Sequence, residues 1–157
     1  MSESPANGTH KPGELPQETV DFAHRMFDAA RGGDKALLEA ALEVGLPANL
    51  TNAQGNTLLM LAAYSGHAEV VRDLIAKGAD VNRLNDKGQA PVAGAVFKGY
   101  EEVVRVLIEG GADPRLGTPT AIQTARMLNQ QNLLKILGAT EADMQEAVPL
   151  PPDPPTT

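Results

Sequence analysis

The sequence predicts an all-α fold, a solenoid of about four helix-turn-helix units. Three observations lead to this prediction. Part of the chain repeats with a period of 33 residues, each period holds two stretches whose apolar residues follow helical spacing, and glycines recur at the turns between them. A period of this length corresponds to a structural unit that must stack on its neighbours to bury its apolar side chains.

The repeat is clearest in the middle of the chain. Residues 52–84 and 85–117 align without a gap and are identical at 13 of 33 positions. The identities fall both at turn glycines, such as Gly66 with Gly99, and at apolar helical positions, such as Leu74 with Leu107. A match of both kinds together indicates a repeated structural unit.

The first unit is degenerate. Residues 1–16 are rich in Ser, Pro, Gly and Glu, and we expect a disordered arm there. From Gln17 the apolar residues take helical spacing, with Thr19 as the expected N-cap. Asp34 is placed to cap a second helix that has Leu37, Leu38, Ala41 and Leu42 on one side. These positions lie 33 residues before their counterparts, so residues 18–51 form a terminal cap with a polar outer side.

The second and third units, residues 52–84 and 85–117, share one pattern. Thr57 is the expected N-cap of a helix, and Pro91 occupies the corresponding first turn, where its missing N–H does no harm. Gly78 stands where a left-handed residue ends a helix. The pattern predicts helices over residues 58–64, 68–77, 91–98 and 101–109.

The fourth unit, residues 118–138, is reached through a shortened turn. Thr120 aligns with Thr57 only if three residues are deleted, and Asn129 then takes the place of Gly66. The pattern predicts helices over residues 120–128 and 131–137, which completes a repeat domain over residues 17–139.

Residues 140–157 form an acidic, proline-rich tail. A capping box of Thr140 and Asp143 predicts at most one turn of helix, followed by an extended, polyproline-like chain. Residues 149–152 match the P-x-x-P pattern, but the nearby charged residues are Glu146 and Asp153 rather than a base. A solvated tail is therefore favoured over a ligand for a P-x-x-P-binding domain.

Three motifs of the chain resemble the ankyrin repeat family: G-x-T at residues 55–57, AAYSGHAEVV at 62–71 and GADVN at 78–82. The resemblance implies an ankyrin-repeat solenoid with short β-hairpin loops. The chain departs from the family's T-P-L-H motif, which reads Thr57-Leu-Leu-Met60 in one unit and Ala90-Pro-Val-Ala93 in the next. The Thr–His hydrogen bonds of the family are then lost, and we predict modest stability, which a urea melt would measure.

Composition excludes several classes of protein. The net charge of −7 disfavours binding to a phosphate backbone, so no nucleic-acid partner is expected, and the acidity weakly suggests a partner with a basic patch. The chain has no cysteine, which excludes disulfides and Cys-based metal sites. No apolar run approaches a membrane span, and no signal peptide is recognisable. We expect a cytoplasmic protein that is a monomer on its own.

The sequence holds no convincing catalytic set. The histidines, His10, His24 and His67, have no metal-like spacing, and the positions equivalent to His67 are Asp34 and Tyr100, so a structural role is favoured for His67. The Gly32-Gly33 turn has no preceding strand and no following Lys-Ser/Thr, so it is interpreted as a plain helix–helix turn. We expect no enzyme activity, no cofactor and no metal.

The resemblance therefore implies a non-catalytic module that binds another protein through its concave face, as an accessory or regulatory protein. Such a face is formed by hairpin tips and the ends of the first helices. Tyr64 and Phe97 could serve as aromatic anchors there or pack between repeats, and the sequence supports both interpretations equally. The alternatives are a small-molecule-binding or enzymatic site between helices, or a secreted effector. The candidate binding residues are Gln54, Asn56, Tyr64, Ser65, Arg83, Asp86, Lys87, Gln89, Phe97 and Lys98.

Overall fold

The computed structural model describes residues 16–147 and contains helices in that part of the chain with no named strand. Residues 1–15 of the predicted arm (residues 1–16) and residues 148–157 of the predicted tail lie outside the described residues. The helices are α1 (Gln17–Gly32), α2 (Lys35–Glu43), α3 (Leu58–Tyr64), α4 (Ala68–Ala76), α5 (Pro91–Lys98), α6 (Glu101–Glu109), α7 (Ala121–Met127), α8 (Gln131–Leu137) and α9 (Glu141–Gln145).

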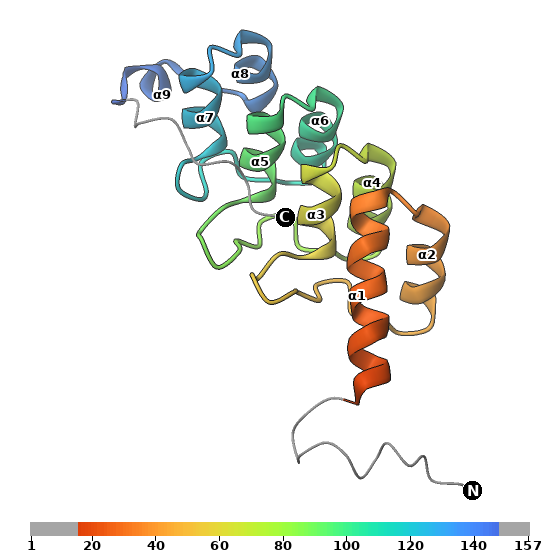
Figure 1. Ribbon diagram of the computed structural model, residues 1–157. Coiled ribbons are helices and arrows are strands. Elements are labelled where there is room, and N and C mark those ends of the chain that lie inside the picture. Colours follow the sequence, from red (N-terminus) through yellow and green to blue (C-terminus); the bar gives the residue numbers. More distant parts are fainter. Residues whose placement is uncertain (1–15, 148–157) are drawn as a thin grey trace, which may run out of the picture.

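The helices stack in two layers, as Figure 1 shows. The inner layer runs α1, α3, α5, α7, and the outer layer runs α2, α4, α6, α8, with each pair joined by a tight turn. Helix α1 is the longest at 16 residues, so its first turns extend past α3. Helix α9 lies beyond α7 at the end of the stack. The all-α solenoid of four helix pairs is thus confirmed.

The core lies between the layers and is continuous from α1 to α8. It consists of Ala, Leu, Val and Ile with Met26 and Phe27, so small and branched side chains fill the space between units. Leu74 and Leu107, which are equivalent in the repeat, are both fully buried. Leu37 was expected on the buried side of its helix, but it is 39% exposed because, among the described residues, no earlier unit packs against α2.

Side-chain caps set several helix starts. The Thr57 hydroxyl accepts a hydrogen bond from the Met60 N–H at 3.1 Å, and Asp34 accepts one from the Leu37 N–H at 3.2 Å. Thr120 forms a full capping box with Gln123. The predicted caps Thr57 and Asp34 are confirmed, whereas Thr120 was predicted as the first residue of its helix and is its N-cap. The expectation for Thr19 is wrong. Helix α1 begins three residues earlier, after Pro16 as the N-cap residue, whose φ of −58° suits a helix entry.

Asparagines organise the loops before α3 and α5. Asn52 Oδ1 accepts hydrogen bonds from the backbone N–H groups of Gln54 and Asn56, each at 3.0 Å, and Asn85 repeats this with Lys87 and Gln89 at 3.0 and 2.9 Å. The β-hairpin character of these loops is limited in the described residues to an isolated antiparallel bridge between Thr51 and Thr57. The loops are therefore turns held by these side chains together with backbone hydrogen bonds, such as those from the Asn52 N–H to the Asn56 carbonyl and from the Asn85 N–H to the Gln89 carbonyl, each at 3.0 Å.

A left-handed residue separates the two helices of a unit. Gly66 has φ of +83°, and Asn129, which was predicted to take its place in the fourth unit, has φ of +58°. Asparagine is among the few residues other than glycine that enter this region readily. The three-residue deletion in the alignment of the fourth unit is therefore supported by backbone conformation.

Candidate protein-binding face

The inner helices α3, α5 and α7, together with the loops that precede them, form a surface that we call the inner face (residues 51–64, 83–98 and 114–127). Adjacent loops are joined directly. The Asp86 N–H donates to the Gln54 carbonyl at 3.0 Å, and the Thr118 N–H donates to the Gly88 carbonyl at 3.0 Å. These bonds fix the spacing of the loop tips, so the inner face is a rigid surface rather than a row of independent loops.

The predicted binding residues fall into three groups on this surface. Ser65, which caps the end of α3, lies next to it. The exposed residues are Gln54, Arg83, Asp86, Lys87 and Lys98. The half-buried residues are Ser65, Gln89 and Phe97, and the buried residues are Asn56 and Tyr64.

Asn56 was expected at an exposed loop tip, and that expectation is wrong. Its side chain is fully buried, and its Oδ1 accepts a hydrogen bond from Asn85 Nδ2 at 2.9 Å. Asn85 Nδ2 also donates to Gln89 Oε1 at 2.8 Å. Because a buried amide must be hydrogen-bonded, this pair joins the second unit to the third from within the loops.

Tyr64 packs between units, which was one of the two alternatives predicted for it. The side chain is only 2% exposed, and its ring lies against Gly94 of α5. A Cβ atom at Gly94 would overlap Cδ1, Cε1 and Cζ of the ring, so this helical glycine provides the space for Tyr64. Burial raises the pKa of the Tyr64 phenol, which keeps it a neutral hydrogen-bond donor.

Charge differs between the inner face and helices α4, α6 and α8, the outer helices of the same three units. The inner face contains five bases and one acid, whereas helices α4, α6 and α8 contain five acids and three bases. Surface ion pairs such as Arg72 with Glu69, at 2.8 Å, and Arg105 with Glu101, at 2.9 Å, connect charges of the outer layer. The inner-face bases are Arg83, Lys87, Lys98, Arg115 and Arg126.

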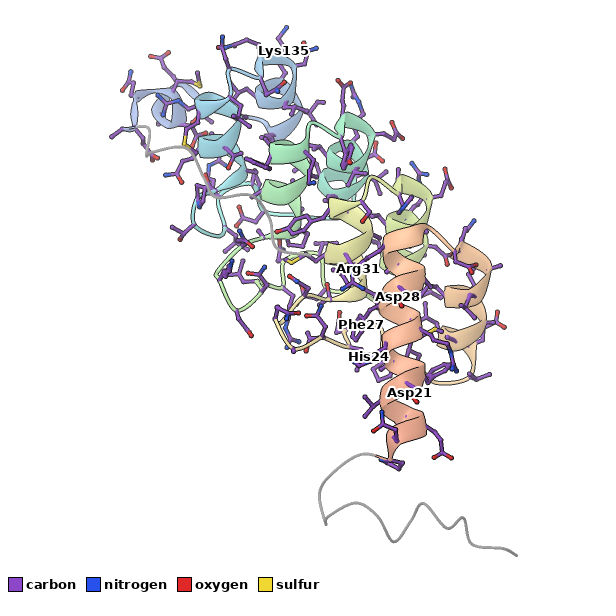
Figure 2. The ribbon with its side chains drawn as sticks, viewed as in Figure 1. Asp21, His24, Phe27, Asp28, Arg31 and Lys135 are labelled. Carbon is purple, nitrogen blue, oxygen red and sulfur yellow. The ribbon has the colours of Figure 1, made fainter. Side chains whose placement is uncertain are left out.

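Sequence reasoning missed a hollow at the first unit. Side chains of α1 and the loop before α3 enclose about 240 Å³ there. Figure 2 shows His24, Phe27, Asp28 and Arg31 along α1. The 33-residue period could have indicated this hollow, because it places Arg31 at the position equivalent to Tyr64 and Phe97. The lining residues are His24, Phe27, Asp28, Arg31, Asn52, Ala53 and Gln54.

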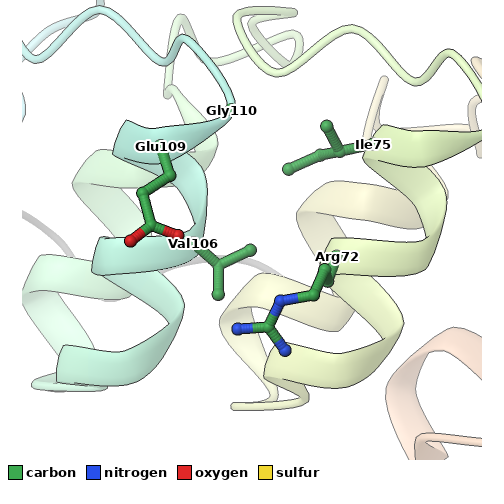
Figure 3. Close-up of a pocket in the computed structure, with 5 residues that line it drawn as sticks. All are labelled: Arg72, Ile75, Val106, Glu109 and Gly110. Carbon is green, nitrogen blue, oxygen red and sulfur yellow. The ribbon is translucent and has the colours of Figure 1, made fainter.

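A second hollow lies on the outer layer between α4 and α6, and Figure 3 shows it. Ile75 and Val106 supply its apolar lining, while Arg72 and Glu109 supply the charges. Arg72 is already paired with Glu69 and with Glu102, at 2.8 and 3.3 Å. At about 150 Å³ this hollow is smaller than that beside α1.

The inner-face base Arg115 holds the last described helix in place. Its Nε and Nη2 donate to Asp143 Oδ1 and Oδ2 at 3.1 and 2.7 Å, a two-pronged ion pair. Arg126 Nη1 donates to the backbone carbonyls of Asp143 and Glu146 at 2.9 and 2.6 Å. Hydrogen bonds from Arg115 and Thr140 hold the pKa of Asp143 well below its usual range. We call these contacts the α9 latch; the sequence revealed only the capping box within it.

His67 has a structural position. Its Nε2 lies 2.7 Å from the Arg31 carbonyl, and its ring fills the space beside Gly33, where a Cβ atom would come within 2.7 Å of Nδ1. The residue therefore connects the start of α4 to the end of α1. In residues 16–147, no three His, Asp or Glu side chains are grouped closely enough to hold a metal ion. No helix in this range combines the length and apolar character that crossing a membrane requires.

Comparison with known proteins identifies the repeat. A family model for ankyrin repeats in three copies matches residues 26–118. An ankyrin repeat protein of Pseudomonas aeruginosa is 54% identical over 59 residues, 38% of this chain and 34% of that protein. The ankyrin repeat domain-containing protein 29 of Danio rerio is 43% identical over 60 residues, and its human counterpart is 40% identical. Each of these two matches covers 38% of this chain and 20% of the relative, so the chain spans a minor part of the relatives' length.

Proposed function

The chain belongs to the ankyrin repeat family, and from this premise we propose that it is a non-catalytic module that binds another protein through its inner face. Members of this family serve in general as protein-interaction modules, and stacked repeats present an extended surface for such binding. The proposed partner contributes an acidic or polar surface. The expectation of a partner with a basic patch rested on the net charge of the whole chain. That value does not distinguish the base-rich inner face from the acid-rich helices α4, α6 and α8.

The observation that carries this proposal is the excess of bases on the inner face of an acidic protein. Arg83 and Lys98 are exposed there, and half-buried Phe97 lies directly before Lys98. Bases beside an aromatic ring are common anchors of protein interfaces. The backbone bonds between the loops support docking with little change of shape, because the tips are already fixed before a partner arrives.

The hollows favour a protein partner over a small molecule. Ligand pockets commonly enclose about 300–1,000 Å³ and are mostly apolar. The hollow beside α1 is about 240 Å³ and is lined largely by polar and charged side chains. It adds polar surface next to the inner face, where it can receive part of a partner.

A comparison of two variants tests the proposal. The first carries Arg83→Ala, Phe97→Ala and Lys98→Ala on the inner face, and the second carries Lys77→Ala, Arg105→Ala and Ile108→Ala on the outer layer. Each set removes two bases and one half-buried apolar side chain. Both are used with the wild-type chain to capture partners from the native cell lysate, after circular dichroism has established intact helicity.

The proposal expects a protein that is captured by the wild type and the outer-layer variant but lost by the inner-face variant. Equal capture by all three chains would refute the inner face as the binding surface. Turnover of a substrate by the purified protein, abolished by a single substitution, would refute the non-catalytic assignment. Binding of the captured protein should weaken as salt is raised, because the proposed contact is partly electrostatic.

We also propose that the module acts as a monomer in the cytoplasm. The lack of cysteine is compatible with that reducing compartment, because the fold needs no disulfide bond. Sedimentation equilibrium of the purified chain tests the first part, and a stable dimer would refute it. Fractionation of cells that produce the protein tests the second part, with recovery in the soluble cytoplasmic fraction as the expected result.

A further inference from the structure

The α9 latch fixes where the chain goes after the repeats. Arg115 binds the Asp143 carboxylate, and Arg126, which belongs to inner helix α7, binds the carbonyls of Asp143 and Glu146. Glu146 has φ of −69° and ψ of 153°, the polyproline II conformation. The chain therefore leaves the described structure beside an inner helix and in extended form.

The segment that follows, residues 148–157, reads VPLPPDPPTT. Five of its ten residues are proline, which favours an extended helix with a rise of about 3.1 Å per residue, or about 31 Å for the segment. Neighbouring helices lie about 8–10 Å apart. Starting beside α7, the segment is thus long enough to cross α5 and reach α3.

The inner face offers two half-buried apolar side chains along this path, Phe97 on α5 and Met127 on α7. The repeat register places Tyr64, Phe97 and Met127 in one row across α3, α5 and α7. Met60 and Tyr64, one helical turn apart on α3, are as buried as core residues but lie outside the continuous core cluster. Proline-rich segments commonly bind beside aromatic side chains, and Phe97 is the half-buried aromatic of this row.

The Tyr64 hydroxyl supplies a second, independent observation. Its Oη is buried and has no hydrogen-bond partner among the described residues. A buried hydroxyl without a partner is destabilising. Proline-rich chains offer many acceptors, because their carbonyls are not used in internal hydrogen bonds. An extended segment on the inner face would provide the missing acceptor.

The distribution of charged residues also favours docking of residues 148–157 on the inner face. Arg115 is already paired with the Asp143 carboxylate, and Arg126 is already bonded to the backbone carbonyls of Asp143 and Glu146. The next exposed bases of the inner face are Lys98 and Arg83. Residues 148–157 contain one acid, Asp153, and no base. A segment of this composition complements the inner face and not the acid-rich outer helices.

We propose that residues 148–157 dock across the inner face of their own chain, so that an external partner must displace them. The inference rests on the proposed function, because both use the inner face. It also names the chemistry that this face recognises, which is an extended, proline-rich acidic segment. A direct covalent link provides an effective concentration in the millimolar range, on the order of 1 mM. The segment therefore occupies the face even when the same peptide, added free, binds weakly.

The absence of cysteine makes a direct test available, because an introduced thiol is unique. A nitroxide spin label is attached to full-length protein carrying Thr156→Cys, and line broadening of backbone amide signals is measured by nuclear magnetic resonance. We expect stronger broadening at residues 61–65 and 94–98 than at the outer helices α4 and α6. Broadening that is weak everywhere, or strongest on the outer helices, would overturn the proposal.

Variants and a mixing experiment complete the test. The spin-labelled chain with Val148→Ser, Leu150→Ser and Asp153→Ser should lose the inner-face broadening, and so should Arg83→Glu with Lys98→Glu. The matched pair Lys77→Glu with Lys135→Glu changes charge equally on the outer layer and should keep it; Figure 2 shows Lys135 there. Retention of the broadening in the segment variant would also overturn the proposal.

Mixing a spin-labelled chain with an isotope-labelled chain that lacks the label separates docking within one molecule from exchange between copies. Broadening that occurs only in the mixture would show that a second copy supplies the segment, which contradicts the proposal. No external partner is present in these measurements. The segment can therefore fail to dock while partner binding is still observed, and the two proposals are tested separately.

Discussion

Gly94 and Tyr64 form a pair for which the direction of the change in unfolding free energy on substitution can be predicted. In an ordinary helix, replacing glycine with alanine stabilises by about 0.5–1 kcal/mol, because alanine loses less chain entropy on folding. At Gly94 the added Cβ would overlap three atoms of the Tyr64 ring. Overpacking of a well-packed site costs about 1–3 kcal/mol. We therefore expect Gly94→Ala to lower the free energy of unfolding by about 0.5–2 kcal/mol, the difference between these terms.

The effect of Gly94→Ala on the free energy of unfolding should change sign when the Tyr64 ring is removed. Tyr64→Val ends at the γ carbons and lacks Cδ1, Cε1 and Cζ, the three atoms that meet the new Cβ. In this background Gly94→Ala should raise the free energy of unfolding by up to about 1 kcal/mol. The double-mutant cycle would then give a coupling energy of about 1–3 kcal/mol, within the range for residues in contact.

The assay is urea unfolding followed by circular dichroism, since the chain has no Trp for fluorescence. Gly32→Ala is the matched control, because a Cβ there meets no atom within 4 Å and φ is not in the left-handed region. This control should be neutral or stabilising by up to about 1 kcal/mol. Equal effects of Gly94→Ala in the wild-type and Tyr64→Val backgrounds would refute the argument that the glycine exists to accommodate the ring.

Three further predictions concern stability. Leu107→Ala should cost about 2–5 kcal/mol in urea unfolding because Leu107 is fully buried, whereas Leu37→Ala should cost clearly less; similar values would contradict the assigned core. Thr120→Ala should cost about 0.5–2 kcal/mol through loss of the cap of α7, and Thr120→Ser should restore most of it. The folded pKa of Asp143 is lowered from 3.8, so its ion pair should stabilise above that pH and be lost as pH falls below it. The difference between the melting temperatures of wild type and Asp143→Asn should therefore be largest at neutral pH and shrink progressively as the pH falls from 3.8 towards 2.5.

The sequence was sufficient to predict the helices and their stacking because those features are periodic. Turn residues such as Gly66 and caps such as Thr57 report local backbone conformation, and the 33-residue period transfers that information between units. Even the irregular fourth unit could be aligned, because Asn129 tolerates the left-handed conformation required at its turn.

Features that depend on one particular neighbour could not be predicted in this way. Tyr64 is buried because position 94 has no side chain, and Asn56 is buried because Asn85 reaches it from the next loop. The pair of Arg115 with Asp143 joins residues 28 apart and lies outside the repeat period. A helical glycine at position 94, where the preceding unit has Leu61, was the available signal that a large side chain lies opposite.

The two ends of the stack differ in a way that determines the order of unfolding. In a solenoid each unit is stabilised mainly by its nearest neighbours, so opening starts where an end unit is held least. The first unit leaves Val44 83% exposed and Leu37 partly exposed, while the last unit is fastened by the α9 latch. Amide hydrogen exchange should therefore be fastest in α2 among helices α1 to α8. A partly opened molecule would retain the inner face of its other units, and so could still hold a partner.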